Sequence, residues 1–290
     1  MSVNRYDAST GELTNIASGQ RTWVGTQEAY KTAKQAGTLP NNAIIAITDD
    51  EQDGLDALIP KNAGARNSIF RGNYLGTAPT AEQYDAIDAG TFEGLMLGDY
   101  WTIGGVNYRI ADFDYWLHTG DTECTDHHIV VVPDENMYTA KMNSSNITTG
   151  GYVGSEMRTT NLATAKTTIQ TAFGSAHILN HRELLTKTVT DGKASDWGWY
   201  DSDAELMSEC MVYGSNIWTS NPGYETGIDK SQLSLFRVKP SLITNRGWYW
   251  LRNVISASSF ADVDYNGHAY GGGASFTNGV RPCFGICKSN

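Results

Sequence analysis

Short runs of alternating apolar residues, separated by turns rich in glycine and asparagine, constrain the fold of this chain most strongly. Residues 98–116 predict two strands around the Gly104–Gly105 turn, and residues 127–133 predict a short apolar strand. Near the C-terminus the runs predict four more strands, over residues 234–238, 247–254, 259–266 and 279–287.

The middle of the chain predicts helices. One begins near Thr160 and has apolar residues on one face. A second is expected from the capping pattern Asn180-x-x-Glu183, and a third from Ser202 to Gly214. The order of strands, helices and strands predicts an α+β domain whose last strands pair with its first.

The N-terminal part predicts a small α/β unit. Residues 20–48 have a βαβ-like pattern in which Thr26 caps a helix, Gly37 ends it and an apolar strand follows. So few residues can hardly form a core alone, which suggests that this part packs against another copy or another protein. We therefore expect an attachment or oligomerisation segment over 1–50, a linker over 51–75 and a large domain over 76–290.

Composition and charge exclude several classes of function. The formal net charge of −11 repels phosphate backbones, so we expect no nucleic-acid partner. No apolar run approaches the roughly 20 residues that span a bilayer, and the N-terminus has no basic and apolar signal pattern. We expect synthesis in the cytoplasm and no membrane insertion.

Sequence patterns for catalysis are equally sparse. The chain contains neither a phosphate-binding Gly-x-x-x-x-Gly-Lys loop, nor Gly-x-Ser-x-Gly, nor His-Glu-x-x-His. Adjacent His127 and His128 point to opposite faces if they lie on a strand, which disfavours a shared metal ion. We therefore expect no enzymatic activity, no cofactor and no metal, and we expect the four scattered cysteines to be buried thiols.

Three pairs of reactive side chains remain as weaker candidates. Cys283 and Cys287 share a strand face, but four strand residues span about 13 Å, too far for one ion without a bend. The carboxylate pairs Asp112/Asp114 and Asp262/Asp264 are each spaced to share a face, and a solvated strand edge explains them adequately.

The most informative stretch is residues 252–282. Small or apolar residues recur in it, and between them stand Asp, Tyr, His, Ser, Gly and Phe, which have no common physical property. All of these are reachable from an asparagine codon by changes at adenines alone. Alternation predicts Ala261 and Val263 inward and Asp262 and Asp264 outward. Exposed aromatic and small residues are typical of binding surfaces, although an ordinary glycine-rich hairpin explains the same pattern about as well.

The frame around this stretch adds a resemblance. GWYWLR before it and NGVRP-x-F after it resemble the C-terminus of the variable proteins of diversity-generating retroelements. Other segments, such as RGNYLGTAPTAEQ and MVYGSNIW, look like tail proteins of gut phages, so the resemblance covers nearly the whole chain. The resemblance implies a C-type-lectin-like fold of the formylglycine-generating-enzyme subtype, in which asparagine codons are diversified while the fold stays fixed.

Carried onto this chain, the resemblance implies a set of ligand-binding residues and a supporting scaffold. The residues that would face the ligand are Asn253, Ser259, Asp262, Asp264, Tyr265, Asn266, His268, Tyr270, Gly272, Gly273 and Phe276. The residues that would hold the backbone are Trp248, Trp250, Leu251, Val263, Gly267, Val280, Arg281 and Pro282.

The leading hypothesis is a non-enzymatic phage tail-tip or fibre protein that binds a host cell-surface protein or glycan. Its N-terminal segment would attach it to other virion tail proteins, and a homotrimer is expected because tail fibres use cyclic symmetry. One alternative is an oxidase resembling formylglycine-generating enzyme, with Cys283 and Cys287 as its copper-binding or redox pair. Another is a purely structural tail component.

Overall fold

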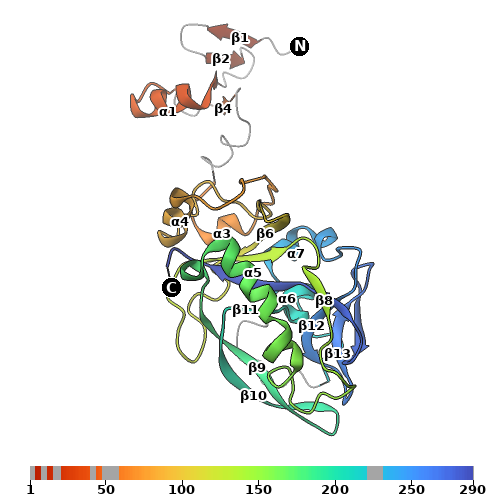
Figure 1. The fold of residues 1–290 in the computed structure, drawn as a ribbon. Coiled ribbons are helices and arrows are strands. Elements are labelled where there is room, and N and C mark those ends of the chain that lie inside the picture. The colour runs from red at the N-terminus through yellow and green to blue at the C-terminus, as the bar shows by residue number, and fades with distance from the viewer. Residues whose placement is uncertain are drawn as a thin grey trace. The chain divides into compact units, whose positions relative to one another are not determined.

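The computed structural model divides into two compact units, Met1–Pro60 and Lys61–Asn290 (Figure 1). The residues that it describes are 4–7, 12–15, 21–39, 44–47, 59–220 and 231–289.

The smaller unit contains the predicted βαβ arrangement. Helix α1 (Gln27–Gln35) connects β3 (Arg21–Gly25) to β4 (Ile44–Ile47), and these two strands are parallel. Two strands that the sequence did not predict, β1 (Asn4–Asp7) and β2 (Glu12–Asn15), extend the sheet in the order β1-β2-β3-β4. The unit is therefore larger than the segment predicted from periodicity.

Local sequence accounts for both ends of α1. The Thr26 hydroxyl accepts a hydrogen bond from the Ala29 amide at 3.1 Å, which confirms the predicted cap. Gly37 has a φ of 67°, the left-handed conformation in which glycine ends a helix. Trp23 and Tyr30 are buried with their ring centroids 5.8 Å apart, and they join the helix to the sheet.

The predicted linker over 51–75 is wrong for its second half. Residues 61–75 belong to the larger unit, where Arg66 is fully buried. The Asn67 amide donates hydrogen bonds to Asp112 Oδ1 and to the Phe113 carbonyl, both at 2.9 Å. Asp112 is itself buried, so the interpretation of this carboxylate as part of a solvated edge is also wrong. The glycine and asparagine residues of 61–75 do indicate irregular structure, but long-range hydrogen bonds hold this segment in place.

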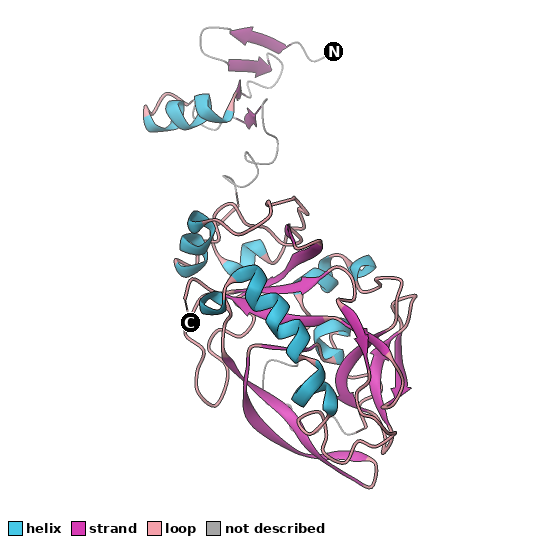
Figure 2. Cartoon of the chain, viewed as in Figure 1, coloured by secondary structure: helices cyan, strands magenta, loops and turns pink. Residues whose placement is uncertain are grey.

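Two five-stranded sheets and a long hairpin carry most of the larger unit (Figure 2). The first sheet, in the order β11-β16-β7-β6-β5, consists of β5 (Tyr100–Ile103), β6 (Val106–Phe113), β7 (Ile129–Pro133), β11 (Ala204–Leu206) and β16 (Pro282–Ile286). The second, in the order β14-β13-β12-β15-β8, consists of β8 (Tyr138–Ala140), β12 (Tyr249–Val254), β13 (Ser259–Val263), β14 (Ala269–Gly273) and β15 (Asn278–Val280). The hairpin pairs β9 (His181–Thr190) with β10 (Lys193–Ser202).

The first sheet joins the two ends of the larger unit. Strand β16 pairs antiparallel with β7, with Phe284 opposite Val131. Strands β5 and β6 form the predicted hairpin, and Gly104 and Gly105 both have positive φ in its turn. These pairings confirm the prediction of an α+β domain whose last strands pair with its first.

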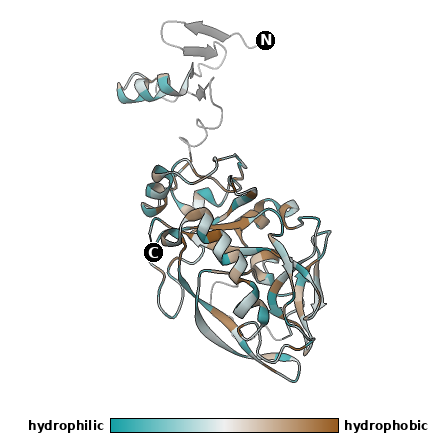
Figure 3. Ribbon diagram, viewed as in Figure 1, coloured by the Kyte–Doolittle hydropathy of each residue, from teal (hydrophilic) through white to brown (hydrophobic). Residues whose placement is uncertain are grey.

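The core lies where helix α5 (Ala163–Phe173) packs on this sheet. The buried face of α5 includes Ala165, Ile169 and Phe173, as the periodicity predicted. The Phe173 ring lies 5.1 Å from that of Tyr108 and 6.1 Å from that of Trp101. Figure 3 shows strongly hydrophobic ribbon beneath this helix.

Shorter helical segments connect the strands. They are α3 (Ala63–Arg66), α4 (Ala81–Asp88), the π-helical turn η1 (Met157–Asn161), η2 (Ser175–His177), α6 (Glu209–Tyr213), α7 (Ser234–Val238) and η4 (Pro240–Leu242). Helix α4 was not among the predicted elements, although Thr80 and Gln83 form a full capping box at its start.

Two predicted helices are wrong because tertiary pairing overrides their capping patterns. Asn180 and Glu183 do not cap a helix: Glu183 lies in β9, opposite Tyr200 of β10. The segment that follows Ser202 begins as a strand, because Glu205 pairs with Cys283 of β16. The helix there starts only after its Ser208 cap, although it ends at Gly214 as predicted.

One predicted strand is a helix. Residues 234–238 form α7, and the Asp112 carboxylate accepts a hydrogen bond from the Ser234 amide at 2.7 Å at its start. A run of five residues with three apolar positions is compatible with both the two-residue period of a strand and the 3.6-residue period of a helix. The buried carboxylate is a long-range partner that no local pattern reveals.

Candidate functional site

The tract of residues 252–282 contributes the end of β12 and all of β13, β14 and β15 to the second sheet. Strands β13 and β14 pair antiparallel, with Asp262 opposite Tyr270. Asp264 shapes the turn between them, because its Oδ1 accepts hydrogen bonds from the amides of Asn266 and His268 at 2.8 and 2.9 Å. The backbone that carries the predicted ligand-binding residues is therefore fixed by pairing and by its own turn.

Five of the eleven predicted ligand-binding residues are exposed: Tyr265, Asn266, His268, Tyr270 and Phe276. The three aromatic members are exposed to 54%, 54% and 58%, respectively, which is unusual for side chains of this size. Ser259 and Gly273 are partly buried. The structure thus places a chemically mixed group of side chains at the surface of one hairpin and its flanks.

The exposed aromatics have supporting neighbours. The Trp248 ring, expected to be scaffold, lies 6.1 Å from the Tyr265 ring and 5.4 Å from the Tyr270 ring, centroid to centroid. Trp218, which the sequence analysis did not single out, is 53% exposed and donates its indole N–H to the Ala269 carbonyl at 3.1 Å. We call Trp218, Tyr265, Tyr270 and Phe276 the aromatic surface.

A buried carboxylate holds the loop that carries Trp218. Glu209 is fully buried, and its oxygens accept hydrogen bonds from the amides of Ile217, Trp218 and Thr219 at 2.9–3.2 Å. The Glu209 amide in turn donates to Asn253 Oδ1 at 2.8 Å. The Glu209–Asn253 contact spans 44 positions and the Trp218–Ala269 contact spans 51, so no local signal could have identified Trp218 as part of the surface.

Two predicted ligand-binding residues are occupied by internal contacts. Asn253 binds the Glu209 amide and also donates to Thr219 Oγ1 at 3.0 Å. Asp264 uses both oxygens within its turn, since Oδ2 also contacts His268 Nδ1 at 3.3 Å. Their side chains support the surface and are not free to contact a ligand.

We expect Asn253→Ala to lower the melting temperature of the larger unit by roughly 5–10 °C, because the change leaves a buried amide without a partner. Asn266→Ala, at an exposed position, should change it by less than about 2 °C. Thermal unfolding followed by circular dichroism measures both. Equal shifts for the two variants would contradict the division into supporting and exposed positions.

The outward orientation predicted for Asp262 is wrong. Asp262 is 1% exposed, and Gly272 beside it is also buried. Asp262 lies on an inner strand opposite Trp250 and Tyr270, whose large side chains share its face of the sheet. Alternation predicts an exposed Asp262 only if one face of the sheet is open to solvent. Here the side chains of Trp250 and Tyr270 lie on the same face as Asp262. A Cβ at position 272 would come within 2.7 Å of both Asp262 Oδ2 and the Trp250 ring, so glycine is required there.

The predicted scaffold residues are mostly in the core. Trp250, Leu251, Val263, Val280 and Arg281 are buried. The Arg281 guanidinium donates to the carbonyls of Pro133, Ile243 and Leu242 at 2.9–3.2 Å and lies 5.1 Å from the Tyr249 ring centroid. Trp248 and Gly267 are partly exposed, so Trp248 contributes to the surface as well as supporting it.

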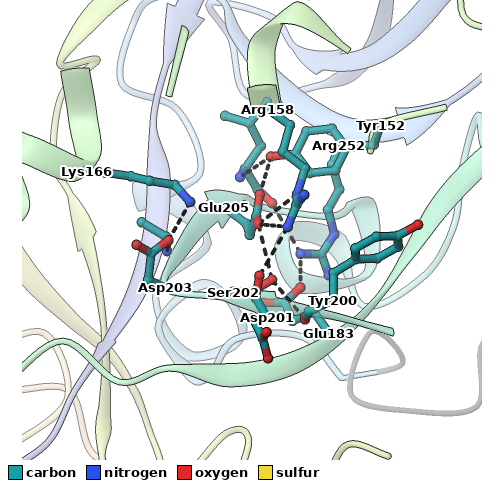
Figure 4. A network of polar contacts seen from close by, with 12 residues as sticks. Tyr152, Arg158, Lys166, Glu183, Tyr200, Asp201, Ser202, Asp203, Glu205 and Arg252 are labelled. Carbon is teal, nitrogen blue, oxygen red and sulfur yellow. Dashed lines mark hydrogen bonds and ion pairs between the residues drawn. The ribbon is translucent and has the colours of Figure 1, made fainter. Parts of the chain in front are cut away.

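A buried ion pair connects β12 to the β9–β10 hairpin (Figure 4). Arg252 of β12 donates to Glu183 of β9, and Glu183 also contacts His181 Nε2 at 2.9 Å. Burial raises the pKa of Glu183, but Arg252 and His181 outweigh it and lower the pKa to about 2. Glu183 is thus a paired, ionised carboxylate suited to structural support.

A second buried carboxylate, that of Glu205, also has hydrogen-bond partners for both of its oxygens. Glu205 accepts hydrogen bonds from Arg158 at 3.0 Å, from the Tyr152 hydroxyl at 2.8 Å and from Ser202 at 3.1 Å (Figure 4). Burial, followed by the charge of Glu205, raises the pKa of Tyr152 well above its usual value. These groups brace η1 against β11.

The histidine cluster does not converge. His127 Nδ1 contacts Asp114 Oδ2 at 2.8 Å, whereas His128 is fully buried and contacts the Asp126 carbonyl and the Trp116 amide. Burial lowers the pKa of His128 to about 3. Among the described residues, no group of three or more His, Cys, Asp or Glu side chains is placed to hold a metal ion.

The cysteines are buried free thiols, as predicted. The Cys283 thiol contacts the Glu205 carbonyl at 3.7 Å, and the Cys287 thiol contacts the His177 carbonyl at 3.9 Å. Burial, with a contribution from the charge of Asp126, raises the pKa of Cys287 to about 12. The thiolate is the form that binds metal and reacts, and burial disfavours this form at Cys287.

Two polar cavities of about 330 and 240 Å³ lie beside the β9–β10 hairpin. Both are lined by Asn180 and Asp201, and neither includes any of the eleven predicted ligand-binding residues. The aromatic surface is therefore separate from these cavities.

Within the described ranges, no helix combines the length and apolarity needed to cross a bilayer. In comparisons with known proteins, no family model, curated protein or solved structure matches this chain significantly.

Proposed function

We propose that this chain is a receptor-binding protein of a phage tail tip or fibre, which attaches the virion to a host cell-surface protein or glycan. The observation that carries the proposal is the aromatic surface: large apolar side chains stay exposed although the backbone beneath them is rigid. Exposed Tyr, Trp and Phe with His and Asn beside them are the residues that binding surfaces enrich. Nothing in folding alone accounts for keeping them in water.

The same proposal assigns the larger unit to a C-type-lectin-like fold of the formylglycine-generating-enzyme subtype. It rests on the resemblance of the C-terminal frame to the variable proteins of diversity-generating retroelements. The pairing of β16 with β7, and the buried Trp250 and Arg281 under the exposed hairpin, are compatible with it. The test of the family is the neighbouring genome. We expect a near-copy of the 3′ end of the gene beside a reverse-transcriptase gene, with AAC codons at the positions of the exposed residues Tyr265, Asn266, His268, Tyr270 and Phe276.

In this scheme the smaller unit attaches the chain to other tail proteins. A homotrimer would present three aromatic surfaces, and avidity would strengthen attachment even where each surface binds weakly. Sedimentation analysis of the full chain tests the trimer independently of binding.

Truncating the aromatic surface should abolish attachment. In flow cytometry of labelled full chain on a panel of bacterial strains, Tyr270→Ala should reduce binding to a recognised strain at least tenfold, because one central aromatic contributes roughly 2 kcal/mol or more. Tyr74→Ala is the matched control, since Tyr74 is 55% exposed and lies outside the 252–282 tract. An equal loss in both variants would reject the aromatic surface as the attachment site.

A further inference from the structure

A buried carboxylate with an unpaired oxygen lies in the sheet that carries the aromatic surface. Asp262 is 1% exposed, and the described residues provide no hydrogen-bond partner for its Oδ1. Its Oδ2 accepts one hydrogen bond, from Asn278 Nδ2 at 2.7 Å. A buried carboxylate normally has a cation or several donors around it, so Asp262 lacks the group that would compensate its charge.

We infer that the aromatic surface recognises a basic side chain of a protein receptor, an arginine above all, whose N–H group pairs with Asp262 Oδ1 while Tyr270 packs on its guanidinium plane. This inference rests on the proposed function and deepens it by naming the chemical class of the ligand. It favours a protein partner over a neutral or acidic glycan.

The register brings the two recognising groups together. Asp262 and Tyr270 are directly opposite in β13 and β14, a relation that places their Cβ atoms roughly 5 Å apart on one face. The Tyr270 side chain is half-exposed, and a rotamer change in such a residue takes nanoseconds or less. The proposed binding step is an outward rotation of this ring, which would admit the cation to Asp262 Oδ1 and leave the ring beside it.

Aromatic rings favour this kind of partner. A guanidinium over a Tyr or Trp face gains roughly 0.5–2 kcal/mol, more when water is excluded. The Trp248 ring also lies near Tyr270, at 5.4 Å between centroids, and the Trp218 indole N–H donates a hydrogen bond to the carbonyl of Ala269, which precedes Tyr270 in the chain. Arginine fits better than a quaternary ammonium, because Asp262 Oδ1 needs an N–H donor.

The electrostatic surroundings also point to a cation. Burial raises the pKa of Asp262 to about 7 against the hydrogen bond from Asn278, and the Asp264 carboxylate adds to the rise. Asp264 is no substitute for Asp262 in binding, because its turn occupies both of its oxygens. A bound guanidinium would supply the charge that Asp262 lacks, and the net charge of −11 would attract basic partners.

The test titrates the full chain with a defined probe, Nα-acetyl-L-arginine methylamide, and with its neutral isostere, the citrulline derivative. Labelling tryptophan with ¹⁵N makes the indole signals the readout, because the Trp218 and Trp250 N–H groups have assigned acceptors at 3.1 and 2.9 Å. At about pH 8 we expect saturable shifts of these signals with the arginine probe, and shifts at least tenfold weaker with citrulline.

Two variants decide the origin of the shifts. Asp262→Asn should weaken binding of the arginine probe at least tenfold, and it should stay folded because it removes an uncompensated buried charge. Asp196→Asn changes the net charge equally at an exposed position paired with Lys187, and it should bind like the parent chain. Equal shifts with arginine and citrulline, or unchanged binding by Asp262→Asn, overturn the inference, as does saturation by Ca²⁺ alone at the same indoles.

The outcome is separable from that of the proposed function. If bacterial attachment depends on Tyr270 but not on Asp262, the aromatic surface stands as the attachment site and the basic ligand is rejected. If attachment depends on neither residue, the proposed function itself fails.

Discussion

Replacing Arg252 with methionine should lower the free energy of unfolding of the larger unit by roughly 3–5 kcal/mol. The change leaves the Glu183 carboxylate buried without its arginine, while the contact with His181 Nε2 remains. Removing one member of a buried ion pair lowers the free energy of unfolding by more than the intact pair contributes to it, because the remaining charge stays buried without its partner. Chemical denaturation of the full chain, with the larger unit followed by tryptophan fluorescence, measures the loss.

The dependence of this effect on pH follows from the low pKa of Glu183. A carboxyl whose pKa is lowered on folding stabilises the protein above its unfolded pKa, near 4.5, and the stabilisation is lost as pH falls towards 2. The penalty of Arg252→Met should therefore be full at pH 7 and shrink below about pH 4.5. Asp121→Ala, which breaks an exposed pair with Arg182, is the control and should cost far less than Arg252→Met. A penalty no larger than that of Asp121→Ala would show that the buried pair does not support the fold.

Replacing Asp262 with asparagine should raise the free energy of unfolding by roughly 4 kcal/mol at pH 8. Burial raises the pKa of Asp262 from 3.8 to about 7, so ionising it in the folded state is unfavourable. A carboxyl with a raised folded pKa gives its full stability below its unfolded pKa, and this is lost as pH rises through the folded value. Asparagine has no such loss and can still accept the hydrogen bond from Asn278.

The gain should therefore be small at about pH 4 and should grow through pH 7 to a plateau. Because both proteins share every other titrating group, the difference between their stabilities isolates Asp262. Asp196→Asn, at an exposed position on β10, should show no comparable rise with pH. A gain independent of pH, or a loss of stability at pH 8, would contradict the burial of an ionised Asp262.

Local sequence predicted several elements because their signals lie within a few residues of one another. The Thr26 cap, the Gly104–Gly105 turn and the apolar face of α5 are all of this kind. The exposed positions Tyr265, His268 and Tyr270 were also among the predicted ligand-binding residues, which the resemblance of the tract implied.

Long-range contacts decided the rest. Asn180-x-x-Glu183 has the pattern of a helix start, yet Glu183 is in a strand and pairs with Arg252, 69 positions away. Trp218 reaches the surface only because Glu209 and Asn253 hold its loop. Asp262 was predicted to face water because alternation gives the direction of each side chain from its strand. It does not show which other residues cover that face.

The sequence by itself therefore determined the α+β class, the β5–β6 hairpin, the Thr26 cap, and the tract from which the exposed side chains come. Only the tertiary structure decided which members of that tract reach solvent and which are tied into the frame. The physical reason is that periodicity reports the direction of a side chain relative to its own backbone. Burial depends on distant residues such as Trp250 and Asn278, which meet Asp262 only after the second sheet has assembled.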